Sequence, residues 1–463
     1  MTQLKADLSN LESYFKALVA EYNVVGASLA VLDNGRVHTA VAGSLNLDTG
    51  VDVTTDSLFQ IGSVSKVFTA TLIMQLVDEG RLALDEPVIT YLPSFHIADP
   101  DATASITIRQ LLCHTSGMEG DFFPEDDQEG PSISSYMAKC YLLPQLHPVG
   151  KNLSYCNSGY VTLGRVIEVV EGTSWAVAIA SRLLRPLGMD HSIVDPRESL
   201  RFRVAMGHVS DPDNNGEPML AKRCYLALST APCGAVLSMS ATDLLKFMQL
   251  HLNKGIAPEG SRLISGASVK AMQESQITLP NLSWRNTTDW GLGWFLSKKQ
   301  DFLSIGHDGG TRGQFAYLRL YSGHNKAIAL LTNSSSTPLF RAMEKEICDV
   351  LSINKKDTSI KEMNQSEQVD INPADYIGRY GNIGGEAEMT WASGVLTLSL
   401  HSAIDKAHDK SAELTPIGQH RFIGVGNSPV VFVGVEKGQP AQYMYWGFRL
   451  FRRLSNAVID SKR

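Results

Sequence analysis

The sequence predicts an α+β protein in which an antiparallel sheet flanked by helices is followed by a small all-β part. Three observations predict this architecture. A helical pattern, a hairpin pattern and a strongly apolar helical pattern follow one another over residues 4–80. Strand patterns return at 290–333 after a long helical stretch, so one sheet is assembled from both ends around an inserted helical subdomain. A polar run at 355–370 then precedes a series of short strands.

Composition and charge narrow the class of protein. The chain has 463 residues, 43% of them hydrophobic, and a net charge of -7. Its length and apolar content suffice for more than one domain. The mild acidity argues against nucleic acid and against an anionic membrane surface as partners. No apolar run is long enough to span a bilayer, and residues 1–8 lack a signal-peptide core. We therefore expect a cytoplasmic protein with no membrane partner.

The six cysteines do not predict a metal site. None forms a Cys-x-x-Cys pair, and no histidines cluster near them at ligand spacing. We expect free buried thiols, and neither a metal nor a cofactor. Cys156 differs from the other cysteines because it falls inside the stretch Tyr155-Cys156-Asn157.

Local patterns predict the elements in order. Apolar residues at helical spacing predict an amphipathic helix over 4–22. Residues 26–43 predict two strands joined at Asn34-Gly35, a strong hairpin signal. Further helices are expected at 106–117 with a threonine cap, 163–170, 175–184, 241–248 and near 350, and further strands from 290, at 315–320 and at 327–333.

The helix that follows Ser63 organises the first part of the chain. Residues 67–77 are apolar nearly all round, as in a helix buried in a large core, and the helix ends at 78–80. The N-terminus of such a helix favours negative charge. Lys66 lies one turn along the same face, so its amine can reach the Ser63 hydroxyl. A desolvated lysine amine can take the proton of a serine and make it a nucleophile.

A capping serine with a solvated lysine is the simpler interpretation of this Ser-x-x-Lys pattern. Two features weigh against it. The helix is too apolar to leave Lys66 in easy contact with water, and Ser65 offers another cap.

The polar composition at 355–370 predicts a linker between two domains, at 1–354 and 371–463. In the second domain, Leu396, Leu398 and Leu400 alternate with polar residues, as in a strand with one buried face. We expect this domain to have its own core and to fold separately from the first.

Three motifs together carry a family resemblance: Ser63-Val64-Ser65-Lys66, Tyr155-Cys156-Asn157 and His307-Asp308-Gly309. In this order, residues 10–350 resemble the serine β-lactamase and penicillin-binding-protein superfamily, whose sister pattern has Ser-Asp-Asn and Lys-Thr-Gly as its later motifs. The nearest branch is that of class C β-lactamases, family VIII carboxylesterases and serine D-peptidases. The C-terminal part, with its Tyr-x-Gly-x-Tyr pattern, resembles the lipocalin-like barrels attached to some members.

The resemblance implies a role for each motif residue. Ser63 is the acylated nucleophile, and Lys66 either accepts its proton or holds the neighbouring base. Tyr155 is the partner base, since a phenolate near pH 7 needs a cation close by, which Lys66 supplies. Asn157 bonds Lys66 and the substrate. The oxyanion hole consists of the Ser63 N–H and a backbone N–H after the third motif, at Gly310.

The third motif departs from the lactamase pattern. His307 stands where lactamases usually carry lysine, followed by Asp308 and Gly309. A neutral imidazole holds a substrate carboxylate less well than an ammonium, so esters are favoured over β-lactams. Arg312 offers a replacement anchor or simply faces solvent. Tyr155 as a core aromatic and His307 as a structural residue remain the alternatives.

We therefore expect a serine hydrolase that acts on an ester or amide of a small molecule or short peptide. Acyl transfer to an alcohol or amine is the enzyme alternative, and a non-catalytic scaffold or filament protein is the alternative from another class. Specificity is expected in loops at 119–131 and 281–289, the first of them an acidic loop typical of solvated surface. The sequence does not decide whether the protein forms a homo-oligomer.

Overall fold

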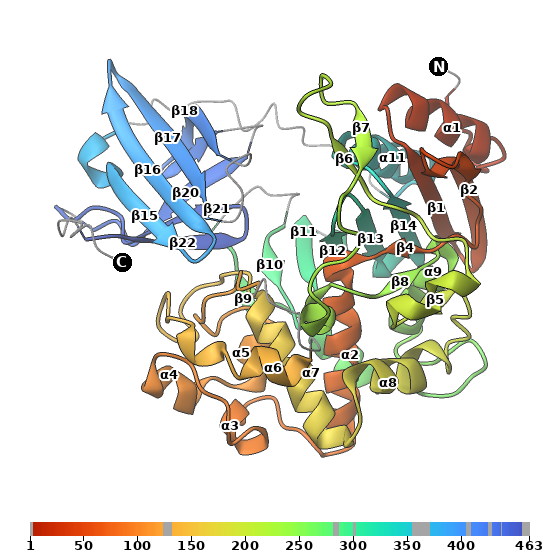
Figure 1. The fold of residues 1–463 in the computed structure, drawn as a ribbon, viewed down its shortest axis with the longest axis horizontal. Helices are drawn as coiled ribbons and strands as arrows, with labels where there is room; N and C mark the ends of the chain where they lie inside the picture. The colour runs from red at the N-terminus through yellow and green to blue at the C-terminus, as the bar shows by residue number, and fades with distance from the viewer. Residues whose placement is uncertain are drawn as a thin grey trace.

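The computed structural model describes residues 3–123, 132–280, 287–299, 302–353, 371–403, 409–424, 428–436 and 438–455. An α+β body holds most of the chain, and a β-barrel lies beside its upper part, in blue in Figure 1. The α+β body contains a nine-stranded sheet in the order β3-β2-β1-β14-β13-β12-β11-β10-β9. The predicted fold class is confirmed, while the predicted linker lies outside the described residues.

The sheet brings together strands from the first and the last stretches of the chain in the α+β body. β1 (Gly26–Asp33) and β2 (Arg36–Asn46) form the predicted hairpin, with positive φ at Asn34 and Gly35. β1 then pairs antiparallel with β14 (Lys326–Thr332), although about three hundred residues of chain separate them. The other strands of this sheet are β3 (Val51–Asp52), β9 (Ile277–Thr278), β10 (Asp289–Trp290), β11 (Phe295–Lys299), β12 (Phe302–Gly310) and β13 (Phe315–Tyr321).

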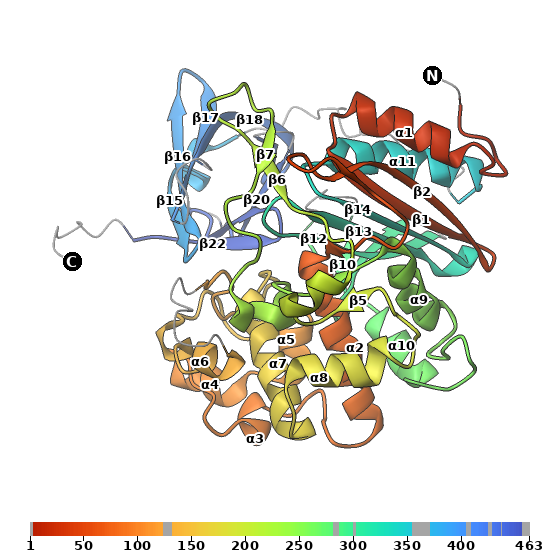
Figure 2. The same ribbon diagram turned by 45° about the vertical axis from the view of Figure 1, so that its right-hand side comes forward.

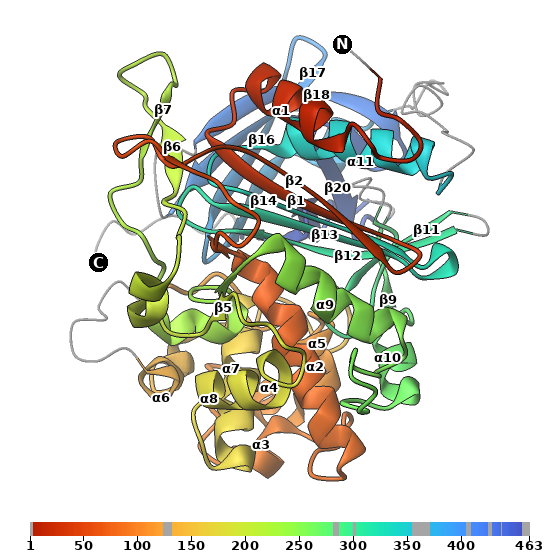
Figure 3. The same ribbon diagram turned by 90° about the vertical axis from the view of Figure 1, so that its right-hand side faces the viewer.

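Two helices cover the outer face of the sheet. α1 (Leu11–Glu21) and α11 (Thr337–Val350) pack there with their own apolar cluster (Figures 2 and 3). α1 begins later than the predicted residue 4 because Leu8 has a φ of +55° and the Asn10 side chain bonds the Lys5 N–H and the Gln3 carbonyl. Those contacts hold the preceding segment as turns.

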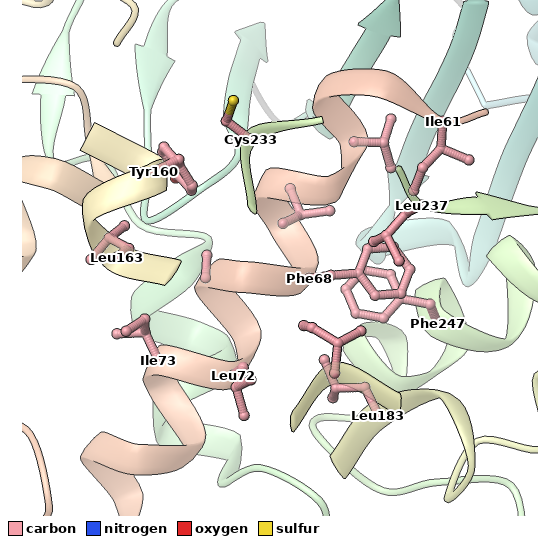
Figure 4. Packing of buried hydrophobic residues seen from close by; sticks show 14 of the residues in the cluster. Ile61, Phe68, Leu72, Ile73, Tyr160, Leu163, Leu183, Cys233, Leu237 and Phe247 are labelled. Atoms are coloured by element: carbon pink, nitrogen blue, oxygen red, sulfur yellow. The ribbon is translucent and has the colours of Figure 1, made fainter. Parts of the chain in front are cut away.

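The inner face is covered by α2 (Ser65–Asp78), which is buried along nearly its whole length, as predicted. Figure 4 shows it between Tyr160 and Leu163 of α7 (Asn157–Glu171) on one side and Phe247 of α9 (Ala241–Leu252) on the other. Phe68 of α2 stacks on Phe247 with ring centroids 3.9 Å apart. This packing holds α2 on both sides, and Ser63 lies in the short turn that precedes its first residue.

Some predicted boundaries need correction. α7 starts at Asn157, six residues before the predicted start, and α5 (Ile108–Leu112) ends well before Gly117. The strand predicted from residue 290 is two short strands, because residues 291–294 form a turn with Gly293 at a φ of +90°. Further helices are α3 (Val88–Tyr91), α4 (Pro100–Ser105), α6 (Ile133–Met137), α8 (Trp175–Ile179) and α10 (Gly266–Met272). In the part of the chain described, no helix is both long and apolar enough to cross a membrane.

The C-terminal part is a closed eight-stranded antiparallel barrel, which confirms the predicted all-β barrel. A cluster of its own apolar residues, among them Tyr380, Leu398 and Phe432, fills it. Its strands are β15 (Gly378–Asn382), β16 (Gly385–Ala392), β17 (Val395–Ser402), β18 (Lys410–Gly418), β19 (Arg421–Ile423), β20 (Pro429–Val433), β21 (Tyr443–Trp446) and β22 (Arg449–Arg453).

A second apolar cluster lies between the two parts, a contact that the sequence did not predict. Tyr155 and Trp290 of the α+β body share this cluster with Tyr443, Tyr445 and Leu450 of the barrel. All five side chains are at most 8% exposed. The barrel therefore has its own core and also buries apolar surface against the site region of the first part.

Candidate active site

Ser63 lies in a short 3₁₀ turn (Gly62–Val64) that leads directly into α2. Gly62 has a φ of +52°, and a Cβ there would lie 2.5 Å from the Gly310 nitrogen. A Cβ on Gly309 would lie 1.9 Å from the Ile61 carbonyl oxygen. Only glycine permits this close approach, so the turn that carries Ser63 packs directly on the end of β12.

Lys66 reaches the Ser63 hydroxyl from the first turn of α2. Its Nζ donates to Ser63 Oγ at 3.1 Å, to Asn157 Oδ1 at 2.7 Å and to the Cys233 carbonyl at 2.6 Å. The side chain is fully buried. The structure therefore excludes the solvated-lysine interpretation of this motif.

The second motif lies across from Lys66. The Tyr155 ring centroid is 4.7 Å from Lys66 Nζ, and Asn157 is buried in the first turn of α7. Between them, Cys156 caps α7, with its Sγ accepting the Gly159 N–H. Burial raises the pKa of the Cys156 thiol to about 12, which keeps it protonated and unreactive. Among the other cysteines, Cys224 is exposed, contrary to the expectation of buried thiols.

Aromatic and imidazole rings surround Tyr155. His114, Trp290 and His307 have ring centroids 4.5, 5.8 and 6.2 Å from that of Tyr155. Burial, reinforced by the Lys66 charge, lowers the pKa of His114 well below its ordinary value, so His114 is neutral. His307 is only 2% exposed, whereas Arg312 is exposed to solvent. The three motifs thus meet, but Arg312 lies at the surface.

The acidic loop departs from the expected solvated surface. Residues 124–131 lie outside the described part, but Glu119 is only 6% exposed and Asp121 is half-buried. Asp121 Oδ1 accepts the Asn157 Nδ2–H at 2.8 Å. Glu119 Oε1 accepts the Ile383 N–H of the barrel at 3.1 Å. This end of the loop therefore connects the second motif to the barrel.

Sequence reasoning also missed Arg449, which comes from the barrel. Its guanidinium pairs with both oxygens of Asp121 and lies 5.2 Å from the Tyr155 ring centroid. Partial burial opposes the charge, but the Asp121 carboxylate outweighs it and raises the pKa of Arg449. Nothing around residue 449 signals this placement, because the contact joins positions 328 residues apart.

The environment of Glu119 should make the free energy of unfolding depend on pH. Burial, with Asp121 nearby, raises the pKa of Glu119 from 4.5 to about 7. A raised folded-state pKa contributes stability that is complete below pH 4.5 and lost as the pH rises through 7. We expect the unfolding free energy of the wild type to fall by about 3 kcal/mol between pH 4.5 and 8, and we expect Glu119→Gln not to show this fall. Urea unfolding of both proteins at each pH measures this difference, and parallel pH profiles would contradict it.

The buried Ser-x-x-Lys pair and the facing tyrosine lie together against the inner face of the α+β sheet. No three His, Cys, Asp or Glu side chains in the described ranges gather as a metal site. The family model described as Beta-lactamase matches residues 11–350. The chain therefore belongs to the β-lactamase family, and an eight-stranded barrel follows its family domain.

Relatives of known name cover one or both parts. Penicillin-binding protein 4 of Amycolatopsis lactamdurans is 41% identical over 349 residues, which are 74% of this chain and 91% of that protein. The crystal structure of SurE, also solved with D-Leu, superposes with a TM-score of 0.78 at 30% identity, over 97% of this chain and 99% of SurE. An octameric penicillin-binding protein homologue from Pyrococcus abyssi has a TM-score of 0.65 at 23% identity, over 96% and 100% of the two chains.

Proposed function

We propose that this protein is a serine hydrolase that cleaves an ester or amide bond, of peptide or lactam type, through an acyl-enzyme on Ser63. The observation that carries the proposal is the 3.1 Å contact between Lys66 Nζ and Ser63 Oγ, in a buried position at the start of α2. Membership of a family that contains penicillin-binding proteins supports the same class of chemistry. The substrate is a small molecule or a short peptide.

Proton transfer involves Lys66 and Tyr155 together. The three acceptors around Lys66 Nζ match the three N–H donors of an ammonium. Lys66 must therefore lose a proton before it can take one from Ser63, or leave that step to Tyr155 while its charge supports the phenolate. We treat the two as one coupled pair that first activates Ser63 and later returns the proton to the leaving group.

Charge on the tetrahedral intermediate is held by backbone donors. The close approach of Gly62 to Gly310 brings the Ser63 segment against the end of β12. We propose the Ser63 and Gly310 N–H groups as the oxyanion hole. Collapse of the intermediate expels the alcohol or amine and leaves the acyl group on Ser63, and water then releases the acid.

Labelling of the full-length protein with a fluorophosphonate tests the proposal directly. The expected result is one modified peptide, with the label on Ser63. A protein that neither labels nor turns over any ester would favour the non-catalytic alternative. Turnover that rises when an alcohol or amine is added, with transfer product formed, would instead favour acyl transfer.

Short activated esters are expected to be cleaved faster than cephalosporins. The buried His307 replaces a lysine that would hold a carboxylate, and such a charged contact is worth about 1.5–3 kcal/mol, or roughly 10–100-fold. The comparison is kcat/KM for nitrophenyl esters, including that of D-leucine, against a chromogenic cephalosporin. Arg312→Ala is the matched variant: if Arg312 replaces the anchor, it lowers only the cephalosporin value. Faster cephalosporin turnover by the wild type would contradict the prediction.

A further inference from the structure

The β21–β22 hairpin of the barrel binds the chain segment that carries Tyr155. The Tyr155 N–H donates to the Phe448 carbonyl at 2.8 Å, and the Tyr445 hydroxyl donates to the Leu153 carbonyl at 2.8 Å. The Leu450 N–H donates to Ser154 Oγ at 3.3 Å. Leu153, Ser154 and Tyr155, which precede α7, thus each form a hydrogen bond with one hairpin, and without it these groups would need other partners.

Arg449 extends from the same hairpin toward the catalytic motifs. Its side chain is 40% exposed and borders a cavity of about 280 Å³, which Asp121, Trp446 and Phe451 also line. Arg449 pairs with Asp121, which lines the same cavity, and lies beside the Tyr155 ring. Asp121 itself is 14% exposed, so the ion pair is well shielded from water on the Asp121 side.

Asp121 connects this ion pair to the catalytic lysine through one amide. Asn157 donates its Nδ2–H to Asp121, and its Oδ1 at the other end accepts from Lys66 Nζ. An asparagine amide has a donor end and an acceptor end. A carboxylate at the Nδ2 end can only accept, so it holds the amide with Oδ1 turned toward the Lys66 ammonium.

We propose that Arg449 and Asp121 are positioning residues of the active site, and that the barrel is thereby part of it. Arg449 orients Asp121, Asp121 fixes the Asn157 amide, and the amide places Lys66 against Ser63. Arg449 also adds a second cation beside Tyr155, where the other facing groups are Lys66, His114 and His307. This inference rests on the proposed hydrolase activity and concerns the same site.

The test compares full-length variants on a nitrophenyl ester, with active sites counted by fluorophosphonate labelling. Arg449→Met is expected to lower kcat per labelled site about 100-fold with little change in KM, because the loss is one of orientation. The double variant Asp121→Asn with Arg449→Met is expected to lose less than the product of the two single losses. Arg452→Met, an exposed arginine on the same strand, is the control and should behave as the wild type.

Two further measurements distinguish positioning from simple support of the interface. Loss of the cation beside Tyr155 is expected to move the pH of half-maximal kcat/KM upward by about 0.5–1 unit, whereas weaker docking alone lowers thermal stability and leaves the profile in place. Arg449→Lys, which keeps the charge but loses the bidentate fork, should fall between wild type and Arg449→Met. Arg449→Lys also tests the positioning role if Arg449→Met does not fold.

The outcomes separate this inference from the proposed function. Arg449 variants with wild-type kcat per labelled site and an unchanged pH profile would overturn the positioning role, even with Ser63 labelled and esters cleaved. A wild-type protein that does not label at Ser63 would instead overturn the hydrolase proposal from which this one starts.

Discussion

Replacing Ser63 by alanine is expected to reduce ester hydrolysis to the background rate and to abolish fluorophosphonate labelling. Removal of the nucleophile in enzymes with an acyl-enzyme costs on the order of 10⁵–10⁶ in kcat. The turn that carries Ser63 should persist, because Gly62 and the buried face of α2 hold it and not the hydroxyl. Steady-state kinetics and mass spectrometry of the labelled protein measure both effects.

Ser65→Ala is the matched control for this substitution. Ser65 is fully buried two residues along the same chain segment, and no partner for its hydroxyl is found in the described residues. Its removal should leave kcat/KM within a few-fold of the wild type. Labelling that survives Ser63→Ala, or that disappears in Ser65→Ala instead, would show that the nucleophile has been misassigned.

Lys66→Ala and Tyr155→Phe are each expected to slow acyl-enzyme formation by about 10³–10⁴. General base catalysis is worth about that much, and Lys66 also supplies the cation 4.7 Å from the Tyr155 ring. Because the two act as one coupled pair, the double variant should be little slower than either single variant. Stopped-flow measurement of the acylation burst isolates this step from product release.

Losses that multiply in the double variant would refute the coupled pair and assign separate steps to the two residues. Thermal melts accompany the kinetics, because Lys66→Ala leaves Asn157 Oδ1 and the Cys233 carbonyl without their buried donor. An unchanged rate of acylation in Tyr155→Phe would show that Tyr155 is a core aromatic residue, which is the alternative interpretation of its sequence context.

Much of the architecture was determined by local sequence. The Asn34-Gly35 turn accepts positive φ at both residues, and the long apolar run after Ser63 is typical of a buried helix, so the hairpin and α2 were predictable. The spacing from Ser63 to Lys66 is one helical turn, which made their contact predictable as well. Alternating apolar residues predicted the C-terminal β-structure. Each of these signals acts over a few residues.

Tertiary structure alone decided how the two parts meet. Asp121 lies in an acidic run that normally faces water, and Arg449 follows a glycine turn with no motif around it, yet they form an ion pair beside Tyr155. The helix start at Asn157 and the late start of α1 also depend on contacts from distant segments or on single side chains. Side-chain pairing across 328 residues depends on the packing of the barrel against the sheet, and no periodicity in the chain encodes it.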